Sequence, residues 1–195
     1  MNKWIIFDLD WVLIHPRYFS EKYEKEFWVS PQEITKFFKH DFRKCLTWEE
    51  DLKIILLPYL RKWNWNKSVE DFLEYWFSYC SKIDLKLLER IRQLKTKWYK
   101  IFVWSDQDKY RSKYIEDAMN LGKEFDAMFF SCNLWVKKSH PDFFKLLSKN
   151  IDINYGIKKQ DLLFFDDKQI NIESAEKEWI KSHIYIYWEI PEINF

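Results

Sequence analysis

The hydrophobic and polar residues of the chain alternate in a way that predicts an α/β protein. Five short apolar runs have the character of buried parallel strands: 3–9, 99–104, 127–130, 162–165 and 183–187. After the second run, segments with apolar residues at helical spacing separate each run from the next. Strands that alternate with helices favour a doubly wound, parallel, five-stranded sheet of the Rossmann-like type.

A helical block interrupts this alternation between the first and second strands. Polar capping residues ahead of amphipathic stretches mark helix starts at Ser30, Thr47, Ser68 and Asp84. We therefore expect a core made of residues 1–14 and 85–195, with a helical cap inserted at residues 15–84. Sheets of this type bind ligands at the carboxyl ends of their strands, so an insertion at that edge can act as a lid.

The composition gives no reason to expect a nucleic acid or a membrane as the partner. Lysine and arginine (32) nearly balance aspartate and glutamate (31), for a net charge of +1. No apolar run reaches about 18 residues, and acidic residues come too early for a signal peptide. The three cysteines lack metal-ligand spacing and indicate reduced thiols in a cytoplasmic protein. The oligomeric state stays open.

Polar side chains follow three of the predicted strands, where the chemistry of such a sheet is expected. They are Asp8 and Asp10 after the first strand, Ser105 and Asp106 after the second, and Asp166 and Asp167 after the fourth. Lys138 lies just before a predicted helix that Pro141 opens. Carboxylates gathered at one edge repel each other unless they share a hard cation, and oxygen-rich sites suit Mg²⁺. A lysine and a hydroxyl nearby suit a phosphate, so the pattern predicts metal-assisted phosphoryl chemistry.

Four segments resemble, in order, the motifs of the haloacid dehalogenase-like (HAD) hydrolase superfamily. Residues 7–13 resemble D-x-D-G-V-L, and 103–107 resemble a strand that ends in Ser-Asn. Residues 135–144 resemble G-x-x-K-P-D-P-x-x-F, and 166–179 resemble D-D-x-x-x-N-x-x-x-A-x-x-x-G. The helical insertion is similar to the helical cap of one subfamily. The segment from Phe164 to the C-terminus looks most like bacterial α-D-glucose-1-phosphate phosphatases.

The resemblance implies hydrolysis of a small phosphorylated metabolite, such as a sugar phosphate, with Mg²⁺ as cofactor. Asp8 is the implied nucleophile that forms an aspartyl-phosphate, and Asp10 the implied general acid and then base. Asp10 is also implied to bind the metal through its backbone carbonyl. The implied phosphate-binding residues are Ser105, Asp106 and Lys138, and the implied metal-binding residues are Asp8, Asp10, Asp166 and Asp167. Asn171 is expected to brace the fourth loop.

Two other functions are compatible with the same motifs. A phosphosugar mutase of the superfamily needs the same Asp8 and Asp10 and differs in what the cap admits. A catalytically impaired HAD-fold binding protein is favoured by Asp106, which stands where the family has Asn, and by Trp11. Single residues also have structural alternatives, since Ser105 is of a type preferred as a helix cap and Lys138 belongs to a lysine-rich chain in which most lysines are solvated. The order of the four motifs favours the catalytic interpretation.

Glycine and tryptophan are present in unusual numbers. The chain has 2 Gly and 12 Trp, whereas usage of roughly 7% glycine would give about 14. Tryptophan stands at three motif glycines (Trp11, Trp135 and Trp179) and at three helix-end or turn positions typical of glycine (Trp28, Trp48 and Trp98). We hypothesise that UGA codons, which specify glycine in the source, have been read as tryptophan. Trp76, on an apolar helical face, is expected to be genuine.

Overall fold

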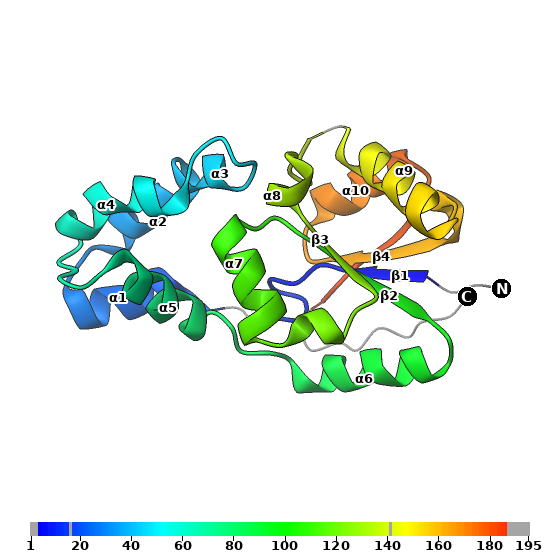
Figure 1. Ribbon diagram of the computed structural model, residues 1–195, viewed down its shortest axis with the longest axis horizontal. Coiled ribbons are helices and arrows are strands. Elements are labelled where there is room, and N and C mark those ends of the chain that lie inside the picture. The colour runs from blue at the N-terminus through cyan, green and yellow to red at the C-terminus, as the bar shows by residue number, and fades with distance from the viewer. Residues whose placement is uncertain (1–3, 16, 141, 187–195) are drawn as a thin grey trace.

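The sheet is parallel throughout and five-stranded, in the order β3-β2-β1-β4-β5 (Figure 1). The computed structural model describes residues 4–15, 17–140 and 142–186. The strands are β1 (Trp4–Phe7), β2 (Lys100–Ser105), β3 (Ala127–Phe130), β4 (Leu162–Asp166) and β5 (Lys181–Ile184). The central strand β1 pairs with β2 and β4, which places Phe7 beside both Val103 and Phe165. The predicted doubly wound α/β fold is confirmed.

Two hydrophobic cores lie on opposite faces of this sheet, because successive side chains of a strand point to opposite sides. Ile5 and Phe7 belong to one core and Ile6 to the other. The first core is covered by α6 (Leu85–Thr96) and by a π-helical segment (Tyr114–Ala118) that continues α7 (Lys109–Lys113). The second is covered by α9 (Phe143–Tyr155) and α10 (Gln169–Lys177). Short helices complete this part: Leu121–Lys123, α8 (Ser131–Leu134) and Lys159–Asp161.

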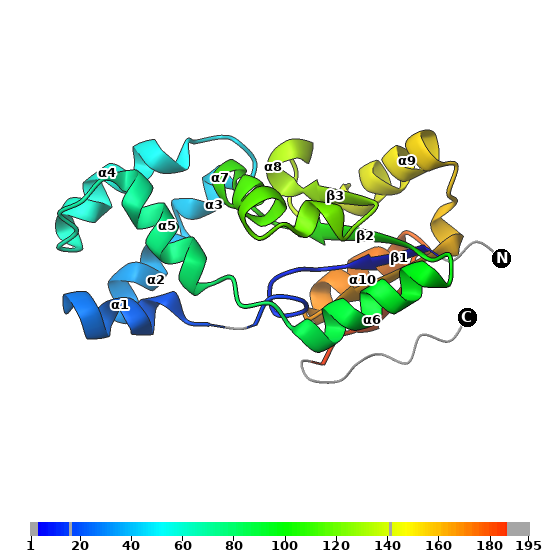
Figure 2. The ribbon, with the colours of Figure 1, turned by 60° about the horizontal axis from the view of Figure 1, so that its bottom comes forward.

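The first five helices form a separate layer, which we call the helical block. They are α1 (Phe19–Phe27), α2 (Pro31–Lys39), α3 (Phe42–Cys45), α4 (Leu52–Lys62) and α5 (Val69–Tyr79). Their own hydrophobic cluster is rich in aromatic residues, including Tyr23, Phe37, Trp63, Phe72 and Trp76. Figures 1 and 2 show the helical block beyond the carboxyl ends of the strands. It therefore faces the edge of the sheet where the functional residues are expected.

Three of the four expected helix starts are confirmed by hydrogen bonds from backbone N–H groups to the capping side chain. Ser30 accepts from Gln32, Ser68 forms a reciprocal capping box with Asp71, and Asp84 accepts from Lys86 and Leu87. The fourth prediction was wrong. The helix begins at Leu52, and its cap is Asp51 rather than Thr47. Trp48 has a φ of 63°, which is left-handed and cannot be part of a right-handed helix.

Six tryptophans adopt a backbone conformation that suits glycine. Trp11, Trp28, Trp48, Trp98, Trp135 and Trp179 have φ between 59° and 68°, and they are exposed, Trp28 and Trp98 to 90%. Side chains with a Cβ disfavour this region, and among the other described non-glycine residues only Asn64 and Asn120 enter it. Trp63, Trp76 and Trp104 are buried at ordinary φ. The six left-handed positions are the six that the sequence marked as glycine sites.

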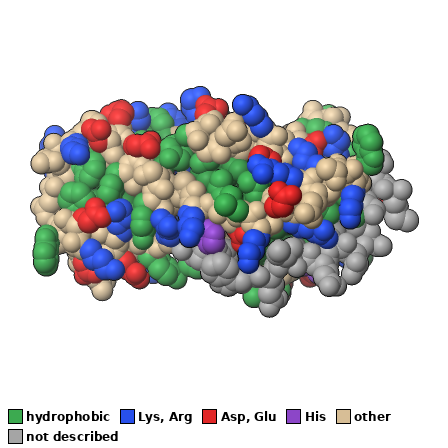
Figure 3. Space-filling model, turned by 90° about the horizontal axis from the view of Figure 1, so that it is seen from below, with side chains coloured by type: hydrophobic (Ala, Val, Ile, Leu, Met, Phe, Trp, Pro, Cys, Tyr) green, Lys and Arg blue, Asp and Glu red, His purple; other side chains and the backbone are tan. Residues whose placement is uncertain are grey.

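Expectations about membrane-spanning helices, cysteine thiols and surface charge can also be compared with the structure. None of the helices in the described part of the chain combines the length and the apolar character needed to cross a membrane. Cys45, Cys80 and Cys132 are free thiols. On the face in Figure 3, basic and acidic side chains are interspersed among hydrophobic ones, as the near-neutral net charge suggests.

Candidate active site

Strand order and register bring the predicted polar residues to one edge of the sheet. Asp8 follows β1, while Ser105 and Asp166 are the last residues of the two strands next to it. Lys138 reaches the same place from the loop after α8. All four side chains are almost completely buried, with Asp8, Ser105 and Lys138 at 3% exposure and Asp166 at 0%. Buried charges are costly unless they are paired, so this arrangement needs an electrostatic explanation.

Lys138 links the nucleophile candidate to the fourth motif. Its Nζ lies 2.6 Å from Oδ2 of Asp8 and 2.6 Å from Oδ2 of Asp166. Burial acts to lower the pKa of Lys138, but these two carboxylates outweigh it and hold the pKa above the ordinary lysine value. Asp106 accepts a hydrogen bond from the backbone N–H of Lys138 (2.9 Å). The carboxylate of Asp106 therefore fixes the Lys138 loop.

Three carboxylates form a group that fits a divalent cation. Oxygens of Asp8, Asp166 and Asp167 all lie within 4.8 Å of one another. Oδ1 of Asp167 is buried and has no hydrogen-bond partner among the described residues, as expected of a metal ligand. Burial raises the pKa of both Asp8 and Asp167, and a bound cation would counter that by favouring the carboxylate form. Hard oxygen donors of this kind suit Mg²⁺.

The first aspartate of the fourth motif, Asp166, is held rigidly by its own loop. Oδ1 of Asp166 accepts hydrogen bonds from the backbone N–H of Lys168 and from Nδ2 of Asn171, both at 2.9 Å. Since its other oxygen contacts Lys138, Asp166 is fully engaged. Asn171 braces the loop as predicted. The free oxygen of Asp167 is the better placed of the two for a metal.

Asp10 points away from this group. Its carboxylate accepts hydrogen bonds from Nε2 of Gln107 (2.7 Å) and from Nη2 of Arg111 (3.0 Å). Burial acts to raise the pKa of Asp10, but Arg111 and Gln107 outweigh it, so the pKa is lowered. The side chain is thus outside the metal group, and only the backbone carbonyl is left for the predicted metal contact. The lowered pKa favours the carboxylate form of Asp10, which suits a general base; to act as an acid, Asp10 must first take up a proton.

Gln107 and Arg111 are the site residues that the sequence analysis missed. Gln107 also donates to Oγ of Ser105 (2.9 Å), so it connects the second motif to Asp10. Both residues are buried. Gln107 lies in the loop just before α7, and Arg111 lies in the first turn of that helix. Gln107 falls within residues 103–107 of the second motif but was given no role, and Arg111 lies outside all four motifs.

A cavity of about 510 Å³ lies between these residues and the helical block. Asp10, Asp106, Gln107 and Arg111 line it from the α/β part, and α1, α2, α3 and α5 line it from the other side. This volume falls in the range of small-molecule sites. The cavity therefore gives a ligand access to the acid–base candidate.

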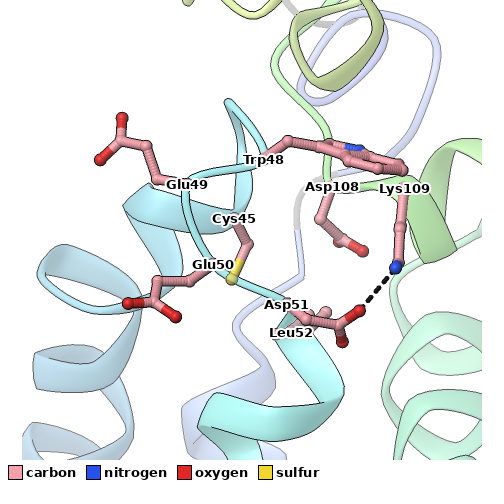
Figure 4. Close-up of a pocket in the computed structure, with 8 residues that line it drawn as sticks. All are labelled: Cys45, Trp48, Glu49, Glu50, Asp51, Leu52, Asp108 and Lys109. Carbon is pink, nitrogen blue, oxygen red and sulfur yellow. Dashed lines mark hydrogen bonds and ion pairs between the residues drawn. The ribbon is translucent and has the colours of Figure 1, made fainter.

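A second cavity, of about 200 Å³, lies where the loop before α4 meets the start of α7 (Figure 4). An ion pair between Lys109 and Asp51 joins the two sides. Asp108 faces this cavity, and burial raises its pKa to about 6. None of the predicted site residues lines it, so we place the candidate active site at the larger cavity.

Comparisons with known proteins find similarity in structure only. No protein-family model and no curated protein matches the chain. An HAD family enzyme from Bacteroides thetaiotaomicron, solved with magnesium and inorganic phosphate, is similar with a TM-score of 0.79 and 19% identity over 97% of this chain and 96% of that one. An HAD-like family hydrolase predicted in Porphyromonas gingivalis is similar with a TM-score of 0.77 and 21% identity over 97% and 93%.

A third solved structure is more distant. A β-phosphoglucomutase proposed in Thermotoga maritima is similar with a TM-score of 0.58 and 18% identity, over 91% of this chain and 82% of that one. At these identities the similarities establish the fold that the chain shares with these proteins. The chemistry has to be argued from the residues of this chain.

Proposed function

The chain has the fold of haloacid dehalogenase-like enzymes, and on that premise we propose that it is a Mg²⁺-dependent phosphatase that acts on a small phosphorylated metabolite. One observation carries the proposal: Lys138 lies 2.6 Å from both Asp8 and Asp166, in a buried carboxylate group that fits a divalent cation. An ordinary ion pair does not need a third carboxylate with an unpartnered oxygen, whereas a metal-assisted phosphoryl site does.

Each residue of the site has its own role in the proposed reaction. Oδ2 of Asp8 attacks phosphorus and the bond to the leaving oxygen breaks, which leaves an aspartyl-phosphate. Asp10 gives its proton to the leaving oxygen and then takes a proton from the water that hydrolyses the aspartyl-phosphate. Lys138 and Ser105 bind the phosphoryl oxygens, and Lys138 offsets their charge. Asp8, Asp167 and the carbonyl of Asp10 would hold Mg²⁺, which would supply further positive charge at the site.

The helical block would serve as the cap of this site. It contributes one side of the 510 Å³ cavity and covers the carboxyl ends of the strands. Closure over a bound phosphate excludes water while the aspartyl-phosphate forms. Sugar phosphates are one class of metabolite that the cavity can hold. Separately, the free thiols favour a reducing, cytoplasmic setting for the protein.

Phosphate release from a panel of phosphomonoesters tests the proposal. Free phosphate identifies a hydrolase, an isomeric sugar phosphate identifies the mutase alternative, and no product from any substrate identifies a binding protein. The panel should contain sugar phosphates, phosphorylated acids and p-nitrophenyl phosphate. Turnover that persists without a divalent cation would contradict the proposal.

Removal of the metal is expected to abolish activity. Chelation by EDTA should lower the rate by at least about a thousandfold, because Asp8, Asp166 and Asp167 then repel one another and the phosphate. Added Mg²⁺ should restore the rate, whereas Ca²⁺, which prefers longer bonds and more ligands, should restore much less. Retention of more than a tenth of the rate in EDTA would contradict the assigned metal site.

Loss of Gln107 is expected to weaken catalysis without unfolding the protein. Gln107→Leu removes the hydrogen bonds to Asp10 and Ser105, and hydrogen bonds to charged groups contribute about 1.5–3 kcal/mol. We expect kcat/KM to fall about 10- to 100-fold. Gln93→Leu, at an exposed position of α6, is the matched control and should leave kcat/KM unchanged. Equal kcat/KM in both variants would mean that Gln107 does not position Asp10.

A further inference from the structure

The cavity beside the proposed site carries more positive than negative charge. Its cationic lining residues are Arg17, Arg43, Arg111, Lys137 and Lys168, and its anionic ones are Asp10 and Asp106. The chain as a whole is almost neutral, so the excess of positive charge is a local feature of the cavity. Lys138, which is assigned to the phosphate, is not among these five.

Both carboxylates in the cavity are already engaged. Asp10 accepts hydrogen bonds from Gln107 and Arg111, and Asp106 accepts from the backbone of Lys138. Neither forms an ion pair with Arg43, Lys137 or Lys168 in the described part of the chain. The remaining charge therefore has to be balanced by solvent, by counter-ions or by a ligand.

Four of the cations have no carboxylate partner in the described part of the chain: Arg17, Arg43, Lys137 and Lys168. Arg17 is already held by Tyr79, because it donates a hydrogen bond to the carbonyl of Tyr79 and lies over its ring. Arg43 lies on α3 of the helical block, while Lys137 and Lys168 lie on the third and fourth motif loops of the α/β part. Figures 1 and 2 show α3 on the side of the helical block that faces α8 and these loops. The cavity is therefore lined by unpaired cations from both parts of the molecule.

The helical block offers little else that would bind a neutral polyhydroxylated substrate. Its cavity-lining residues are mainly aromatic: Tyr18, Phe19, Phe38, Phe42 and Trp76. Ser20 and Thr35 add two hydroxyls, and no carboxylate or amide side chain of the helical block lines the cavity. Sugar hydroxyls are usually fixed by such polar groups, whereas aromatic and cationic residues suit a compact carbon skeleton with a negative charge.

We infer that the substrate carries a second anionic group, a carboxylate or a second phosphate, which Arg43 binds together with Lys137 and Lys168. This inference rests on the proposed phosphatase function and narrows its substrate class. The phosphoryl group occupies the Asp8 site, and the second anion lies toward the helical block. Because Arg43 belongs to that block, the second anion would also favour its closure over the substrate.

Matched substrate pairs test this inference. Glycerol 3-phosphate and 3-phosphoglycerate differ by a carboxylate, as do glucose 6-phosphate and 6-phosphogluconate. Fructose 6-phosphate and fructose 1,6-bisphosphate differ by a phosphate. We expect kcat/KM to be at least tenfold higher for the more anionic member of at least one pair, and the pair shows which anion is preferred. Since Trp11 also lines the cavity, both the chain as written and its glycine version should be measured.

Variants test whether Arg43 causes the preference for the more anionic substrate. Arg43→Gln is expected to lower kcat/KM for the more anionic member about 10- to 100-fold and to bring the ratio within the pair toward one. Arg61→Gln removes an exposed arginine of α4 outside the cavity and should leave the ratio unchanged. Turnover without any preference within the pairs, or an equal fall for both members in Arg43→Gln, would overturn the inference and leave the phosphatase function standing. No turnover of any substrate would overturn both.

Discussion

Asp8→Asn is expected to lower the phosphatase rate by at least about 10⁴-fold, the scale on which removal of a catalytic nucleophile acts. The amide nitrogen and oxygen of Asn are poor nucleophiles, and Asn cannot supply the negative oxygen that attacks phosphorus. The substitution keeps the side-chain shape, so the sheet and both cores should survive. Phosphate release with saturating Mg²⁺ measures the loss, and thermal unfolding reports the fold.

A matched control separates the nucleophile from a general effect of lost charge. Asp117→Asn removes an exposed carboxylate whose only ion pair in the described part of the chain is with Lys113, and it should leave the rate unchanged. Asp8→Asn also removes one of the two carboxylates beside Lys138. The expected result for Asp8→Asn is therefore a nearly complete loss of kcat in a protein that keeps its structure. A rate within tenfold of the parent would mean that another group attacks phosphorus.

Replacement of six tryptophans by glycine is expected to stabilise the protein, although glycine usually destabilises. Trp11, Trp28, Trp48, Trp98, Trp135 and Trp179 all hold a left-handed φ, which disfavours a residue with a Cβ by roughly 1–2 kcal/mol each. Glycine adopts this conformation freely. We expect the free energy of unfolding to rise by several kcal/mol in the sixfold variant, measured by urea denaturation.

The buried tryptophans supply the opposite control. Trp63 is 1% exposed and Trp104 is 0% exposed, and both pack among aromatic rings. Glycine at either position should destabilise the protein by about 3–5 kcal/mol or more, because it leaves a cavity. The same division should be visible in the gene, with UGA codons at the six left-handed positions and UGG at 63 and 104. UGG codons at positions 11, 135 and 179 would contradict the glycine hypothesis.

Replacement of the six tryptophans by glycine is also expected to change the phosphatase activity. Trp11 follows Asp10 directly and lines the cavity, so its indole occupies space that a substrate would use. We expect the glycine version to turn over phosphomonoesters faster than the chain as written. The comparison with Asp8→Asn in the same background assigns any gain to this site.

Much of the fold and part of the site followed from local patterns. Apolar runs and helical spacing gave the five strands and their order in the chain, because each depends on residues close in sequence. Capping residues located three helix starts, since Ser30, Ser68 and Asp84 bond to backbone groups within three positions. The start at Thr47 was misplaced because the chain turns at Trp48 before the helix begins.

The sequence alone indicated the residues to which the proposed chemistry is assigned, because the motifs lie at strand ends that a parallel sheet brings together. It also located the six glycine-like positions, because backbone conformation is a local property. Only the tertiary structure decided how those residues are held. Gln107 and Arg111 reach Asp10 across 97 and 101 residues, and Asp106 holds the backbone of Lys138 across 32. Arg43, Lys137 and Lys168 likewise come to line one cavity only through folding. No periodicity encodes such contacts, because they depend on how the helical block and the sheet pack together.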